Sequence, residues 1–133
     1  MLKLRSSIVF VALALGCSGG GGTTDGGSDA AVIVNGCTTF SDLTAGGGTI
    51  NFPTQAAPAQ YQPNCARIKA GQTLTWSGSF TSHPLTPSGG DSPSPIQATA
   101  TGANKSFTFP NTGTFGFACG IHASMSGAIE VVP

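Results

Sequence analysis

Charged residues are scarce in this chain of 133 residues: only 8% are Asp, Glu, Lys or Arg, and the formal net charge is zero. Two of the five basic residues, Lys3 and Arg5, stand at the extreme N-terminus, so the rest of the chain has no basic patch. A nucleic acid is therefore not an expected partner. The five acidic residues are scattered, and no segment holds the paired carboxylates of a hydrolase. Histidine and methionine are rarer still, with two of each.

Residues 1–16 have the features of an export signal. A short basic region with Lys3 and Arg5 precedes an apolar run, residues 8–15, that ends at a small residue. The run is too short to span a bilayer as a helix, which needs about 20 residues. Once the signal is removed, three basic and five acidic residues leave a net charge of −2.

The stretch Leu13-Ala-Leu-Gly-Cys17 resembles a bacterial lipobox, in which the cysteine becomes the lipidated N-terminus. Residues 18–30 are mostly Gly, Ser, Thr and Asp, and they predict a flexible tether with an rms reach of about 20 Å. A tether of this kind supports lipidation of Cys17, because an anchored domain must clear the lipid headgroups; ordinary secretion is the alternative. The expected organisation is a signal peptide (1–16), a lipidated cysteine with its tether (17–34) and one folded domain (35–133).

The remainder of the chain predicts a single all-β domain. It shows no periodicity of 3.6 residues over a helix length, and its short Val, Ile, Thr and Phe runs are separated by Gly and Pro. Apolar and polar residues alternate within the runs, as at Leu74 and Trp76, which is typical of half-buried antiparallel strands. The predicted strands are residues 48–52, 64–70, 71–77, 104–109, 114–119 and 126–132. Trp76 is expected to lie in the core.

Two segments carry weaker patterns. Residues 36–45 fit either a strand or the start of a short helix. Residues 84–97 contain four prolines and a Gly-Gly pair, and we expect them to form a long surface loop.

The four cysteines divide by elimination. If Cys17 is acylated and Cys119 binds a metal, Cys37 and Cys65 remain, and an exported chain lies in a compartment where they can pair. Closing that loop would contribute roughly 3 kcal/mol. Two buried free thiols, or a pairing of one of them with Cys119, are the alternatives.

The stretch from Cys119 to Met125 predicts a metal site. It places a thiol, the imidazole of His122 and a thioether within seven residues, and the second histidine of the chain, His83, could arrive from a neighbouring strand end. Two His and one Cys with a weak axial Met is the donor set of blue copper centres. Zinc seldom takes methionine, so Met125 favours one copper ion, cycling between Cu(I) and Cu(II), over zinc.

Residues 66–133 resemble a small cupredoxin of the plastocyanin and amicyanin type. The resemblance rests on residues 68–76 (IKAGQTLTW), Ser82-His83 and residues 107–132 (FTFPNTGTFGFACGIHASMSGAIEVV). It implies a Greek-key β-sandwich with copper at one end, and it implies the copper ligands His83, Cys119, His122 and Met125. The family commonly has Asn directly after the first histidine, where this chain has Pro84, so no reduction potential is carried over.

The function that follows is a monomeric electron carrier of the cell envelope, tethered to a membrane and facing the periplasm or the exterior. The resemblance also implies transient docking of redox proteins on an apolar patch beside His122, for which we expect Pro84, Leu85 and Ile121. The alternatives are a copper carrier without a redox role and a metal-free interaction domain. We expect no enzymatic activity. A multicopper oxidase in particular is excluded, because two histidines cannot supply its additional centres.

Overall fold

The computed structural model describes residues 32–52 and 59–133. The predictions for the signal peptide, for Cys17 and for most of the tether lie outside these residues. The described residues form eight strands and contain no helix, so none of them provides a helix able to cross a membrane. The strands are β1 (Ser41–Asp42), β2 (Gly48–Asn51), β3 (Cys65–Lys69), β4 (Thr73–Ser77), β5 (Leu85–Gly90), β6 (Asn104–Thr108), β7 (Gly113–Cys119) and β8 (Ser126–Val132).

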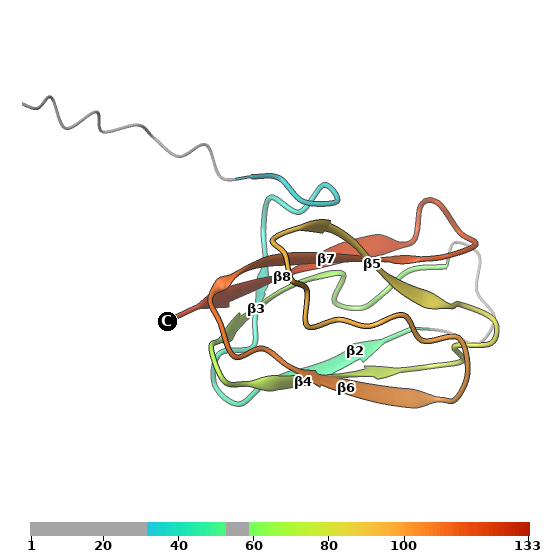
Figure 1. The fold of residues 1–133 in the computed structure, drawn as a ribbon, viewed down its shortest axis with the longest axis horizontal. Helices are drawn as coiled ribbons and strands as arrows, with labels where there is room; N and C mark the ends of the chain where they lie inside the picture. The colour runs from blue at the N-terminus through green and yellow to red at the C-terminus, as the bar shows by residue number, and fades with distance from the viewer. Residues whose placement is uncertain (1–31, 53–58) are drawn as a thin grey trace, which may run out of the picture.

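The eight strands form two sheets, and this confirms the predicted all-β sandwich. The larger sheet has the order β1-β3-β8-β7-β5, and the smaller has the order β2-β4-β6 (Figure 1). The pairing is not wholly antiparallel as the alternation suggested. β3 runs parallel to both β1 and β8, and β2 runs parallel to β4, because the chain crosses between the sheets before it returns.

The core between the sheets is aromatic. Trp76 on β4 is fully buried and meets Phe117 on β7 edge to face, with ring centroids 5.2 Å apart. Phe107 on β6 packs against the same indole at 5.5 Å. Such pairs add about 0.5–1.5 kcal/mol each beyond the area they bury. The predicted core position of Trp76 is thus confirmed.

The segment predicted to be a long loop contains a strand. Residues 85–90 form β5 and pair with β7 from Leu85↔Cys119 to Gly90↔Phe115, with an irregularity between Pro87 and Gly90. β5 is an edge strand, where a proline is tolerated because no neighbour needs its missing N–H. The sequence pattern did not predict this strand, because proline and paired glycines are typical of loops.

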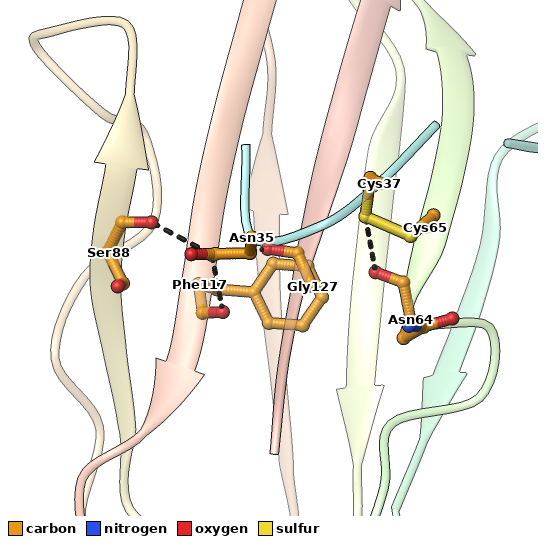
Figure 2. Close-up of a disulfide and its surroundings, with 7 residues drawn as sticks. All are labelled: Asn35, Cys37, Asn64, Cys65, Ser88, Phe117 and Gly127. Atoms are coloured by element: carbon orange, nitrogen blue, oxygen red, sulfur yellow. Dashed lines mark hydrogen bonds between the residues drawn. A yellow bond between two sulfur atoms is a disulfide. The ribbon is translucent and has the colours of Figure 1, made fainter. Parts of the chain in front are cut away.

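The N-terminal segment, residues 32–37, covers the outer face of the larger sheet, on the side away from β2, β4 and β6 (Figure 1). Val34 and Cys37 are buried there against Ala128 of β8. Cys37 and Cys65 form the disulfide expected from the sequence, which ties this segment to β3 (Figure 2).

Removing the disulfide should destabilise the sandwich without unfolding it at room temperature. The bond closes a loop with a sequence separation of 28, which corresponds to roughly 3 to 4 kcal/mol of chain entropy. We expect Cys37→Ser combined with Cys65→Ser to lower the free energy of unfolding by that amount in urea titrations of the metal-free protein. A loss below about 1 kcal/mol would contradict this role for the bond.

Candidate metal centre

The hairpin of β7 and β8 supplies three of the four predicted ligands. Cys119 is the last residue of β7, and β8 begins directly after Met125. The connecting loop is closed by its own backbone: Cys119 N–H donates to the carbonyl of Met125 at 2.8 Å, and Met125 N–H donates to that of His122 at 3.0 Å. These bonds fix the loop as a compact turn at one end of the sandwich.

The fourth predicted ligand arrives from the β4–β5 connection. His83 N–H donates to the carbonyl of Ser79 at 2.9 Å, which ends a tight turn just before β5 begins at Leu85. Leu85 pairs with Cys119, so β5 holds the histidine beside the cysteine although 36 residues separate them. Gly120 N–H donates to the carbonyl of Pro84 at 2.7 Å and joins the two loops directly.

Three donor atoms converge at this point. The Nδ1 atoms of His83 and His122 are 3.1 Å apart, and the Sγ of Cys119 lies 3.9 Å from the first and 3.4 Å from the second. Both rings therefore present Nδ1 to the thiol. Two atoms that each lie about 2.0–2.3 Å from a shared ion can be at most roughly 4.5 Å apart, and all three separations satisfy that limit.

The three groups differ in their access to water. His83 is 4% exposed and Cys119 is 6% exposed, whereas His122 lies at the surface. Cys119 is the only unpaired cysteine among the described residues. The site is therefore shielded from water at Cys119 and His83 and is open to water at the edge of the His122 ring.

Aromatic side chains form the inner wall of the group. The ring of Phe52 meets the His83 ring edge to face at 6.1 Å, and Tyr61 packs between Phe52 and Phe117. The Tyr61 hydroxyl is buried and finds no hydrogen-bond partner among the described residues. Burial, and secondarily the charge of Cys119, raises the pKa of Tyr61 well above its usual range. This wall therefore keeps the site apolar on its inner side.

Burial lowers the pKa of His83, and the neighbouring His122 lowers it further. The imidazole is thus held in the neutral form, which is the form that binds metals.

The remaining predicted ligand, Met125, is fully buried in the cluster that also contains Cys119 and Leu85. Its backbone closes the loop, as described above, but its role as the axial ligand stays a prediction. The His, Cys and His donors with this thioether form a group suited to a single copper ion and to the type 1 arrangement.

The patch expected beside His122 needs one correction. Leu85 is fully buried and faces the core, because its place in β5 opposite Cys119 turns it inward, so it offers nothing to a partner. Ile121 is 63% exposed and Pro84 is partly exposed. The backbone carbonyl of Pro84, bonded to Gly120, joins the two ligand loops.

No protein-family model matches the chain, and no curated protein matches it. Solved structures do match the chain. The chain is similar to cupredoxins. A purple cupredoxin from Nitrosopumilus maritimus shares 20% identity and a TM-score of 0.49, covering 64% of this chain and 99% of that one.

Two further structures extend the comparison. A pseudoazurin from Methylobacterium extorquens AM1 shares 19% identity at a TM-score of 0.46, covering 62% of this chain and 74% of that one. A copper-containing nitrite reductase from Thermus scotoductus SA-01 shares 21% identity at a TM-score of 0.48, covering 64% of this chain. This chain spans only 22% of the length of that reductase. The choice of copper here therefore rests on the donor set.

The lowered pKa of His83 predicts a pH dependence in the metal-free protein. The unfolded chain takes up a proton on this histidine near pH 6.5, before the folded protein does, so stability is lost as the pH falls below that value. Urea titrations from pH 7.5 to 5 should show the decline, and His83→Gln, which cannot take up this proton, should show a smaller one. Equal declines in the two proteins would contradict the assignment.

Proposed function

We propose that this protein is a type 1 copper protein that carries single electrons between redox partners in the cell envelope. The convergence of the His83, Cys119 and His122 donor atoms within bonding reach of one ion supports the proposal most directly. Copper held by these residues, with Met125 as a weak fourth donor, would supply one-electron chemistry in a donor set that suits both Cu(I) and Cu(II).

The protein's own part is to hold the donors still and to keep water away. Backbone hydrogen bonds close the loop on Cys119 and join it to Pro84, so the cysteine and both histidines are positioned by the sheet. Buried Phe52 and Tyr61 exclude water from the inner side. A site whose four donors are all side chains also leaves no position for a substrate, and this favours a carrier over an enzyme.

His122 is the proposed point of electron exit, because it is the one exposed donor. Exposed Ile121 and partly exposed Pro84 flank it and offer a small apolar surface for brief contacts with redox proteins. Export and lipid attachment at Cys17 complete the proposal, which takes the protein as a tethered monomer on a membrane facing the periplasm or exterior.

A visible absorption spectrum tests the proposal. The protein loaded with one equivalent of Cu(II) should be intensely coloured, blue to green, and ascorbate should bleach it reversibly. A copper-bound but colourless protein would favour the copper carrier without a redox role. Failure to bind copper would favour a metal-free interaction domain.

Replacing the thiolate should remove the colour while the fold remains. In Cys119→Ser we expect the intense band to disappear, because the cysteine sulfur is the donor that produces it. Ser124→Ala, an exposed change in the same loop, should keep both the band and its intensity. Circular dichroism checks that both variants are folded, and an intense band in the serine variant would contradict the ligand assignment.

A charge beside His122 should slow electron exchange. In Ile121→Asp we expect electron self-exchange between two copies, measured by NMR line broadening in mixed oxidation states, to fall about tenfold or more at low salt, since two like charges then face each other. The absorption spectrum should be unchanged. Val32→Asp, at a still more exposed site on the N-terminal segment, should leave the rate within a factor of about two. Equal rates for both variants would remove the docking surface from the proposal.

A further inference from the structure

A single asparagine bonds to three strands of the larger sheet. Asn35 lies on the N-terminal segment, and Figure 2 shows its side chain reaching toward Ser88 and Phe117 beside Gly127. Its Nδ2 donates to the backbone carbonyls of Gly127 at 2.8 Å, Ser88 at 2.9 Å and Phe117 at 3.2 Å. An amide nitrogen has two N–H groups, so the two shortest contacts are the principal bonds and the third is shared.

The three strands that Asn35 joins are those that deliver the predicted ligands. Ser88 belongs to β5, which follows His83. Phe117 belongs to β7, two residues before Cys119, and Gly127 belongs to β8, two residues after Met125. Phe117 and Gly127 also face each other across the hairpin. One side chain therefore connects the bases of both ligand-bearing loops.

The backbone around this contact is arranged to admit it. The β5–β7 ladder is irregular between Pro87 and Gly90, at the point where the carbonyl of Ser88 accepts the bond from Asn35. A Cβ at Gly116 of β7 would collide with that carbonyl and would lie 2.8 Å from Asn35 Nδ2. The glycine thus leaves the space through which the amide reaches the sheet.

The segment itself is held in place from both sides. Asn35 has a φ of 49° and Gly36 a φ of 77°, a left-handed turn that asparagine and glycine adopt most readily. Cys37 N–H donates to the carbonyl of Val34 at 3.0 Å and closes the turn, and Cys37 is bonded through the disulfide to β3. The asparagine is therefore presented to the sheet by a fixed backbone.

We propose that Asn35 is a positioning residue for the metal centre. It holds the β4–β5 loop, which carries His83, and the β7–β8 loop at the separation that brings the donor atoms together. The proposal deepens the proposed function and rests on it. The hydrogen bonds of the Asn35 side chain go to three backbone carbonyls and not to a ligand side chain, so Asn35 acts through the backbone. Loss of its amide should loosen the ligand loops more than the rest of the fold.

The first test uses the metal-free full chain and needs no colour. Asn35→Gly removes the amide and keeps the left-handed turn; Asn35→Asp keeps the shape but sets a carboxylate against three carbonyls. We expect amide hydrogen exchange at Cys119, Gly120 and Met125, whose N–H groups close the loops, to rise at least tenfold in both variants. If the aspartate variant fails to fold, the glycine variant decides.

Gln72→Ala is the matched control. Gln72 is also an amide side chain that binds backbone, with its Nε2 donating to Thr44 and its Oε1 accepting from Lys69. Lys69 pairs with Val132, at the end of β8 remote from Met125. This variant should change exchange in the ligand loops less than threefold. Equal effects of Asn35→Gly and Gln72→Ala on those three amides would overturn the proposal, leaving Asn35 a general stabilising contact.

The second test uses the copper-loaded chain. We expect a chelator to remove copper at least tenfold faster from Asn35→Gly than from the unaltered protein, and the absorption band to shift, while Gln72→Ala keeps both properties. If the unaltered protein shows no intense band, the proposed function fails, and hydrogen exchange alone decides whether Asn35 holds the loops. If it is coloured and Asn35→Gly matches it in band and rate, the positioning role is overturned.

Discussion

The pairing of β5 with β7 is the constraint on which the site depends. His83 and Cys119 are 36 residues apart, and they meet because the ladder that begins at Leu85↔Cys119 sets the two strand ends side by side. The bond from Gly120 to the carbonyl of Pro84 extends the contact into the loops. β7 is paired on both edges and its Phe117 is buried against Trp76, so the cysteine ends a strand that is held on both sides.

Burial and exposure divide the proposed work between the two histidines. The inner histidine, His83, is shielded by Phe52 and kept neutral by its surroundings, while His122 reaches the surface. Such a division suits an ion that must exchange electrons but not ligands. The N-terminal segment forms a second layer behind the larger sheet. The Cys37–Cys65 disulfide and the hydrogen bonds of Asn35 attach it there. Rigidity at the site is thus supplied from both faces of the larger sheet.

Local patterns in the sequence predicted what depends on near neighbours, and missed what depends on distant backbone. The Cys119–Met125 stretch and the alternation at Leu74 and Trp76 could be found from residue types and spacing. The pairing of Cys37 with Cys65 followed by elimination once Cys17 and Cys119 were given other roles. β5 was missed because Pro87 and two glycines break the usual strand pattern, and Leu85 was consequently placed on the surface instead of in the core.

Asn35 could not be found from the sequence either, because its three partners are backbone carbonyls 53 to 92 residues away and leave no side-chain signature.

X-ray absorption at the copper edge tests most directly whether the distant donors share one ion. The account predicts one copper per chain with one short sulfur and two imidazole nitrogens, nearly unchanged on reduction. A first shell without sulfur, or copper bound only by nitrogen and oxygen at several sites, would contradict it.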